Sequence, residues 1–203
     1  MRAAPVLLAA VALLLSGCAG VSPEQKREAS ARMQMGVTYM QQRNLPAALR
    51  ELSKASELDP GNPEIDMMLG LAFQSRGDLG KAEEYLRIAI GKRPDYAEAH
   101  NNLGNLLSQL GRGEEAIREY GQAASNVLYP TPEYAYYNMG REYFRRQNLD
   151  KAEETFAKAG VAAEIEVYGA AHGWCPPDST VYNEPLAEKA WGRLLALYGK
   201  ALA

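Results

Sequence analysis

The stretch EIEVYGAAHGWCPPDS (residues 164–179) holds the residues best suited to chemistry, because His172 lies in a glycine-rich segment close to Cys175. A histidine acts as a general base only when a nucleophile lies within hydrogen-bond reach and a carboxylate orients the ring. A sharp elbow that presents a Ser or Cys nucleophile has the form Gly-x-Ser/Cys-x-Gly. The only glycines four positions apart are Gly169 and Gly173, and Ala171 lies between them. His172 therefore lacks a recognisable nucleophile, and we predict that the chain is not an enzyme.

Other kinds of reactive site are equally poorly supported. His100 and His172 are the only histidines, there is no Cys-x-x-Cys pair, and no glycine-rich phosphate loop is present. The formal net charge of −3 argues against a nucleic-acid partner. We therefore expect no metal, no cofactor and no small-molecule substrate.

The amino-terminal segment has the features of an export signal. Met1 and Arg2 precede the apolar run 6–15, which is too short to span a bilayer but suits a secretory signal. The run ends in Leu-Ser-Gly-Cys at Cys18, which resembles the lipobox of bacterial lipoproteins. The resemblance implies a signal peptide over 1–17, acylation of Cys18, an acylated tether over 18–28 and, because Ala19 follows, an outer-membrane anchor facing the periplasm. A plain signal peptide with a chance cysteine is the alternative.

Small residues recur along the chain at nearly constant spacing. Gly36, Gly70, Gly104 and Gly140 are 34, 34 and 36 positions apart, and Ala48, Ala82, Ala116 and Ala152 keep the same spacing. This pattern resembles the tetratricopeptide repeat, in which small residues allow two helices to approach closely. The resemblance implies an all-α helical-hairpin solenoid with units at 29–62, 63–96, 97–130 and a truncated fourth at 133–159, whose stacking provides the core.

Solenoids of this kind bind peptides in a concave groove lined by the first helix of each unit. Carried over from the family, the groove residues run from an apolar, Met-rich end through Asn to an aromatic and cationic end. They are Met33, Val37, Met40, Met67, Leu71, Gln74, Asn101, Asn105, Ser108, Tyr137, Arg141, Phe144 and Arg145. Asn can hydrogen-bond a peptide backbone, and Arg141 and Arg145 can engage a carboxylate.

The joint between the third and fourth units, NVLYPTPEYAYYNMG (residues 126–140), is two residues longer than the others. Together with the lipobox and the repeats, it resembles the type IV pilus pilotins. These outer-membrane lipoproteins help a secretin ring to assemble. The resemblance implies a membrane-anchored adaptor whose protein partner is a pilus secretin, and a generic envelope scaffold is the alternative.

The repeat pattern stops after Ala159. Residues 160–203 resemble the carboxyl end of the dienelactone hydrolase family, an α/β-hydrolase class. We expect a strand over 163–168, a loop over 169–183 and an amphipathic helix over 185–202 that caps the last repeat. His172 matches the histidine of that family's triad. An esterase of this kind is the competing function, although the fragment lacks both the nucleophile and the acid.

Overall fold

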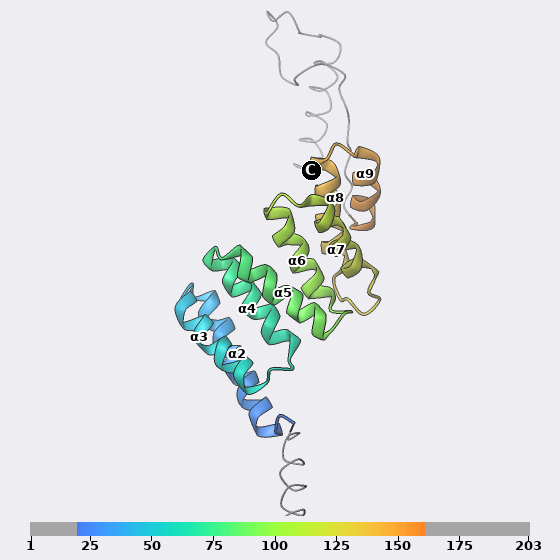
Figure 1. Ribbon diagram of the computed structural model, residues 1–203. Coiled ribbons are helices and arrows are strands. Elements are labelled where there is room, and N and C mark those ends of the chain that lie inside the picture. The colour runs from blue at the N-terminus through green and yellow to red at the C-terminus, as the bar shows by residue number, and fades with distance from the viewer. Residues whose placement is uncertain (1–19, 161–203) are drawn as a thin grey trace, which may run out of the picture. The chain divides into compact units, whose positions relative to one another are not determined.

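The computed structural model describes residues 20–160 (Figure 1). The chain divides into two compact units, Met1–Ala162 and Ala163–Ala203. The predictions for the signal peptide, Cys18, His172, Cys175 and the hydrolase-like segment from residue 161 onward lie outside the described residues. Within residues 20–160 the structure contains eight α-helices and no strand, which confirms the predicted all-α class for this part.

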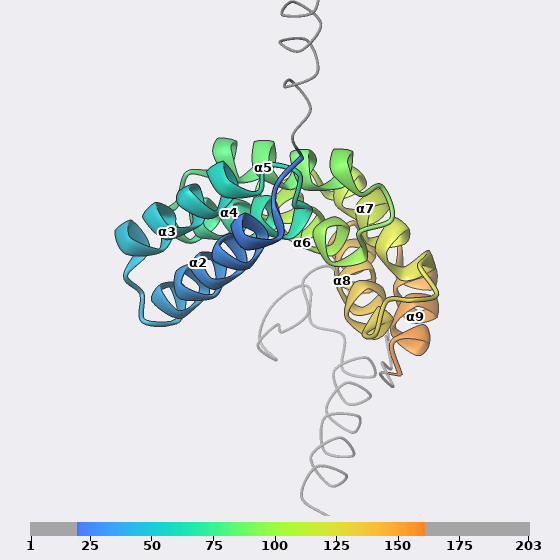
Figure 2. The same ribbon diagram turned by 90° about the horizontal axis from the view of Figure 1, so that it is seen from below.

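The helices follow one another in pairs. They are α2 (Pro23–Gln41), α3 (Leu45–Leu58), α4 (Pro63–Arg76), α5 (Leu79–Lys92), α6 (Ala97–Gln109), α7 (Gly113–Ser125), α8 (Pro132–Arg145) and α9 (Leu149–Lys158). Each odd-numbered helix packs against the even-numbered helix before it, and α3, α5 and α7 also pack against the even-numbered helix that follows. The even-numbered helices also contact one another in succession, and Figure 2 shows them on the inner side of the stack. This is the predicted solenoid of helical hairpins.

The first helix begins earlier than the repeat spacing indicates. Pro23 opens α2, so residues 23–28, which we expected in the tether, form its first turns. Ser22 and Gln25 make a reciprocal capping box: the Ser22 hydroxyl accepts from the Gln25 amide at 3.1 Å, and the Gln25 side chain accepts from the Ser22 amide at 2.9 Å. The sequence Ser-Pro-x-Gln therefore starts the helix by itself.

The turns within the pairs follow one pattern. A single residue in the left-handed region ends the first helix at Arg43, Gly77, Gly111 and Gln147, again 34, 34 and 36 positions apart. The next residue is the N-cap of the second helix. In three units the N-cap side chain accepts a hydrogen bond from a backbone amide three residues later, and these N-caps are Asn44, Asp78 and Asn148. Asn44 and Asn148 thus open the second helix of their pairs.

The recurring glycines lie where the paired helices meet. A Cβ atom on Gly36, Gly70 or Gly104 would lie 2.5–2.8 Å from a carbon of the facing side chain, closer than real Cβ contacts. The recurring alanines of the facing helices are completely buried, namely Ala48, Ala82, Ala116 and Ala152. The prediction that small residues permit close helix approach is therefore confirmed.

The long joint between α7 and α8 is an ordered loop with its own small core. The Asn126 side chain donates to the Asp95 carbonyl at 2.6 Å and accepts from the Leu128 amide at 2.8 Å. Tyr129 is buried against Ala97, Ala123 and Ala135. The joint therefore packs onto the stack through Asn126 and Tyr129, whereas Val127 and Leu128 are exposed.

Candidate peptide-binding groove

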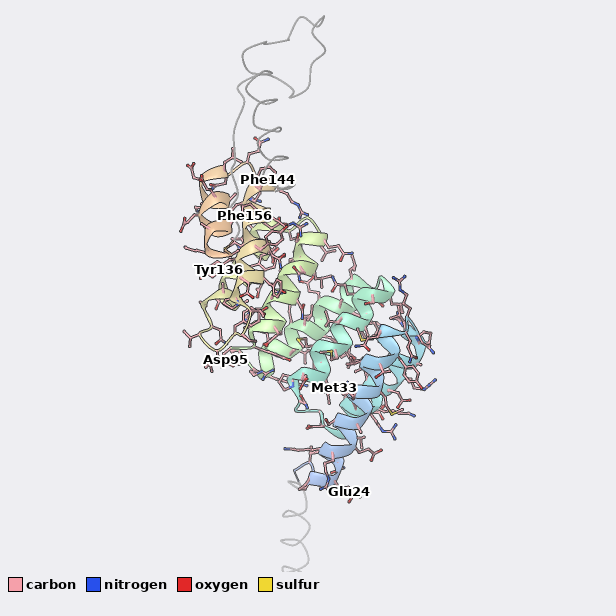
Figure 3. All side chains as sticks on the ribbon, turned by 180° about the vertical axis from the view of Figure 1, so that it is seen from behind. Glu24, Met33, Asp95, Tyr136, Phe144 and Phe156 are labelled. Carbon is pink, nitrogen blue, oxygen red and sulfur yellow. The ribbon has the colours of Figure 1, made fainter. Side chains whose placement is uncertain are left out.

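The even-numbered helices carry all thirteen predicted groove residues, and the structure divides these residues into three groups. Met33 and Met67, only 8% and 5% exposed, belong to the core, so the expected Met-rich end is much reduced. Figure 3 marks Met33 on α2 and Phe144 on α8, near the two ends of the stack. Half-buried residues are Val37, Met40, Leu71, Gln74, Asn101, Asn105 and Ser108, and exposed residues are Tyr137, Arg141, Phe144 and Arg145.

The polar half of this surface contains a pocket of about 490 Å³ between α6 and α8. Its lining combines four predicted groove residues with four that were not predicted. The predicted ones are Asn105, Ser108, Arg141 and Arg145, and the others are Gln109, Tyr120, Asn138 and Glu142. Four of the thirteen predicted groove residues therefore line this pocket, and they make up half of its lining.

Tyr120 enters the pocket from α7, the second helix of its pair. Its ring lies against Gly104, where an added Cβ would be 2.5 Å from the ring, and its hydroxyl donates to the Asn105 side-chain oxygen at 2.9 Å. Burial and the nearby charge of Glu142 raise the pKa of Tyr120 to about 12. The hydroxyl therefore keeps its proton at any ordinary pH and remains a hydrogen-bond donor.

Glu142, in the last turn of α8, contributes a buried carboxylate to this pocket and is only 5% exposed. It accepts from the Ser108 hydroxyl and from the Arg145 guanidinium, both at 2.5 Å. The same Arg145 nitrogen donates to the Ser108 oxygen at 2.8 Å. A buried charge needs such partners, so Arg145, which we predicted to engage a ligand carboxylate, already pairs with a carboxylate of its own helix.

Arg141 is in a different situation. No Asp or Glu of residues 20–160 lies within ion-pair distance of it, and its guanidinium carbon lies 5.9 Å from the centre of the Tyr137 ring. Its side chain lines the pocket. Among residues 20–160, Arg141 therefore has no hydrogen-bond or ion-pair partner, unlike Arg145 in the same pocket.

The other half of the groove is apolar. Val37, Met40 and Leu71 are half-buried on α2 and α4, and a hydrogen bond of 3.0 Å from Gln74 to Gln109 joins the two halves. No group of three His, Cys, Asp or Glu side chains suited to a metal ion occurs among residues 20–160. In the same part of the chain, no helix has both the length and the apolarity needed to cross a bilayer.

Sequence reasoning missed Tyr120 because it searched only the first helix of each unit. A signal was present: Tyr120 is 34 positions after Leu86 and 68 after Leu52, so it replaces a recurring leucine. A polar substitution at a repeat position that normally packs the core indicates a local role.

Comparison with known proteins agrees with this architecture. The tetratricopeptide repeat model matches residues 33–89 and 67–131. The chain is therefore a tetratricopeptide repeat protein, a non-enzymatic class of fold.

More specific relatives belong to pilus systems. The type IV pilus assembly protein PilF of Pseudomonas aeruginosa is 31% identical over 165 residues, which cover 78% of this chain and 66% of PilF. The solved PilF structure superposes with a TM-score of 0.65 at 29% identity, covering 67% of this chain and 61% of that one. PilW, described as a type IV pilus biogenesis factor, gives a TM-score of 0.62 at 26% identity, covering 64% and 60%. The chain thus spans about two thirds of the length of PilF, and PilF and PilW are its homologues.

The carboxyl-terminal part has a second relationship. The dienelactone hydrolase family model matches residues 115–202, which confirms the resemblance of the tail. The match begins earlier than the expected junction near residue 160. Residues 115–160 nevertheless form the helices α7, α8 and α9 of the repeat stack.

Proposed function

We propose that this protein is a membrane-anchored adaptor that binds a protein partner in type IV pilus biogenesis. The similarity to PilF, in sequence and in fold, is the observation that carries the proposal. The partner that the pilotin resemblance indicates is the pilus secretin. Binding takes place on the inner side of the stack, along α2, α4, α6 and α8.

The groove supports reversible binding of an extended segment. Val37, Met40 and Leu71 supply apolar contact at one end, and methionine adapts to varied shapes. The pocket between α6 and α8 supplies hydrogen-bond donors at the other end. A segment that presents apolar and then polar side chains therefore fits the order of the groove.

The anchor in this proposal is the acylated Cys18. Each buried methylene contributes about 0.8 kcal/mol, and two or more chains hold a protein stably on a bilayer. We expect Cys18→Ala to abolish incorporation of labelled palmitate and to release the protein from the outer-membrane fraction. Incorporation that persists in the variant would rule out this anchor.

A crosslinked pull-down from the cell envelope tests the partner. We expect the native chain to recover secretin and Leu71→Asp to lose most of it, because the charge would face the apolar half of the groove. Ile88→Asp is the matched control, since Ile88 is exposed on α5, an outer helix. Recovery of other envelope proteins without secretin would replace the pilus role with a general scaffold role. Equal recovery by both variants would contradict binding in the groove.

A hydrolase is the second candidate, because the dienelactone hydrolase model matches residues 115–202. Such an enzyme needs a nucleophile for His172, and the sequence contains no Gly-x-Ser/Cys-x-Gly elbow. Hydrolysis of a p-nitrophenyl ester by the native chain, lost in His172→Ala, would establish this activity against our expectation.

A further inference from the structure

The joint between α7 and α8 and the start of α8 carry the three most exposed large hydrophobic side chains of residues 20–160. Val127 is 95% exposed, Leu128 is 83% exposed, and Tyr134, in the first turn of α8, is 60% exposed. All three lie within the short segment 127–134. Single apolar side chains on a surface are common, but a cluster that projects into water indicates contact with an apolar partner.

The joint has contacts of its own that fix its position on the stack. The Asn126 side chain bonds to the Asp95 carbonyl at 2.6 Å and to the Leu128 amide at 2.8 Å. On the other side of the exposed pair, Tyr129 is buried. Val127 and Leu128 therefore project from a loop that is attached to the stack on both sides of them.

The exposed pair replaces residues of a different kind in the earlier joints. Val127 takes the place of Arg93 and Asp59, which lie 34 and 68 positions earlier in the chain. Leu128 likewise takes the place of a proline, Pro94, in the preceding joint. Such a change at an exposed repeat position adds nothing to the core, so it indicates a function of this joint.

The joint lies at the end of the stack from which the amino-terminal segment departs. Because the helices of each pair are antiparallel, α2 and α8 begin at the same end (Figure 1). Pro23, the first residue of α2, is five positions after Cys18, and five residues span at most about 18 Å. With Cys18 acylated, the start of α2 lies within this distance of the bilayer, and the end of the stack that carries the joint faces it.

We propose that the joint between α7 and α8 inserts into the membrane surface, with Val127 and Leu128 among the acyl chains and Tyr134 at the level of the headgroups. The inference rests on the proposed acylation of Cys18. Tyrosine suits the boundary between lipid and water because its ring is apolar and its hydroxyl polar. Residues 126–134 include no Lys or Arg, so the contact is apolar and does not depend on anionic headgroups.

The acyl chains and the joint have different roles in this arrangement. Acyl chains hold the protein on the bilayer, but attachment at one point leaves the stack free to turn about that point. The joint precedes the last helix pair, whereas the anchor precedes the first. A second contact so far along the stack fixes the direction in which the groove faces.

Spin labels on the full, acylated chain in vesicles test the proposal. A nitroxide attached through Val127→Cys reports on the joint, and its ring is itself apolar. A nitroxide attached through Leu110→Cys, an exposed position at the opposite end of the helices, is the control. Cys175→Ser removes the other thiol from both chains.

We expect the label at position 127 to collide with lipid-soluble oxygen and to be protected from a water-soluble nickel complex. The label at position 110 should show the reverse. Both results should be the same in vesicles of phosphatidylcholine alone and in vesicles that also contain phosphatidylglycerol.

A matched pair of charge substitutions measures the contribution of Leu128. Leu128→Asp should lower the population of the inserted joint by at least about tenfold, the effect expected when one leucine side chain no longer leaves water. The label at position 127 then becomes accessible to the nickel complex. Leu110→Asp makes the same change at the opposite end and should leave the label protected. Both leucines are exposed, so the urea midpoints should stay near that of the native chain.

The outcomes are distinct. A label at position 127 that stays accessible to the nickel complex, on a chain that sediments with the vesicles, overturns the inference and leaves the anchored adaptor standing. Protection that appears only when purified secretin is added would mean that the joint contacts protein, and protection only in anionic vesicles would mean that it binds headgroups. Either result overturns apolar insertion. A chain that carries no acyl group and stays in solution overturns both the anchor and the inference.

Discussion

The first two helix pairs and the last two share a backbone pattern, but they differ in the side chains that face the recurring glycines. Gly36 and Gly70 face Leu52 and Leu86, so the first half of the stack closes on aliphatic side chains. In the third pair Gly104 faces the ring of Tyr120. The groove changes from apolar to hydrogen-bonding where leucine gives way to tyrosine.

This difference shows that one set of residues determines the helix packing and another set determines the chemistry of the groove. The glycines fix how closely the helices approach, and they are the same in all four units. The residue that faces the glycine, together with the residue that follows the glycine on the first helix, determines the chemistry: Leu86 with Leu71 in one half, Tyr120 with Asn105 in the other. A repeat protein can therefore change a binding surface without changing its fold.

Transferring the tyrosine to the first half should have the largest effect. Leu86 is completely buried against Gly70, so Leu86→Tyr adds volume and a hydroxyl that faces Leu71. We expect a loss of roughly 2–4 kcal/mol in the free energy of unfolding, from overpacking and an unsatisfied polar group. Urea unfolding measures it, and Leu86→Met is the control.

The double variant Leu86→Tyr with Leu71→Asn should recover about 1 kcal/mol of that loss, because it restores the hydrogen bond seen between Tyr120 and Asn105. Absence of any recovery would mean that the two halves differ by more than this pair of residues.

Glycine replacement should affect the halves unequally. In Gly104→Ala the new Cβ would meet a ring whose far end is held by Asn105, whereas in Gly36→Ala it would meet the side chain of Leu52, which can rotate. We expect Gly104→Ala to cost about 1–2 kcal/mol after the gain in helix propensity, and Gly36→Ala less than about 1 kcal/mol. Equal urea midpoints for the two variants would contradict this ordering.

The halves should also differ in their response to pH. Position 66 is an aspartate that pairs with Lys92, whereas the corresponding His100 lies 2.7 Å from Glu119 and 2.9 Å from the Pro94 carbonyl. Burial disfavours the charge on His100, but these hydrogen bonds outweigh it, and the pKa of His100 is raised. A raised pKa in the folded state stabilises the fold fully below the ordinary value of about 6.5, and this stabilisation is lost as the pH rises through the folded value.

The stability difference between the native chain and His100→Gln should therefore shrink from pH 5.5 to pH 8.5, as urea unfolding at several pH values can measure. A difference that grows over this range would mean that His100 is held neutral.

The smallest effect on stability should come from the turn residues with positive φ, and it should be equal in the two halves. Arg43 and Gln147 adopt φ values of 58° and 57°, where Gly77 and Gly111 occupy the corresponding turns. Arg43→Gly and Gln147→Gly relieve this conformation but enlarge the freedom of the unfolded chain, so each should stabilise by up to about 1 kcal/mol. Thermal unfolding would show the gain, and a loss in either variant would indicate that its side chain makes a stabilising contact.

Prediction from the sequence worked where several residues repeat in phase. The glycines and alanines predicted the helix pairs, because a small residue at a helix contact has one main structural reason. The start of α2 was missed, since the Ser22 capping box lies outside the repeat. Local capping and repeat phase are independent signals.

The site was harder to predict than the fold. Arg141 lines the pocket as expected, but Arg145 pairs with Glu142, and family positions alone cannot show such a local partner. Met33 and Met67 are buried. The position of a residue on its helix determines which way the side chain points, but the neighbouring repeat unit determines whether that side chain is covered. Tyr120 was missed because it approaches from the second helix.

The early start of α2 has a mechanical consequence. Residues 23–28 are exposed and continue the helix before Ala29, the first residue buried in the stack, and six helical residues form a rod of about 9 Å. Each residue added to or removed from this rod would change its length by about 1.5 Å and turn the stack by about 100° relative to whatever holds its amino end. The length of this rod therefore determines the direction in which the groove faces.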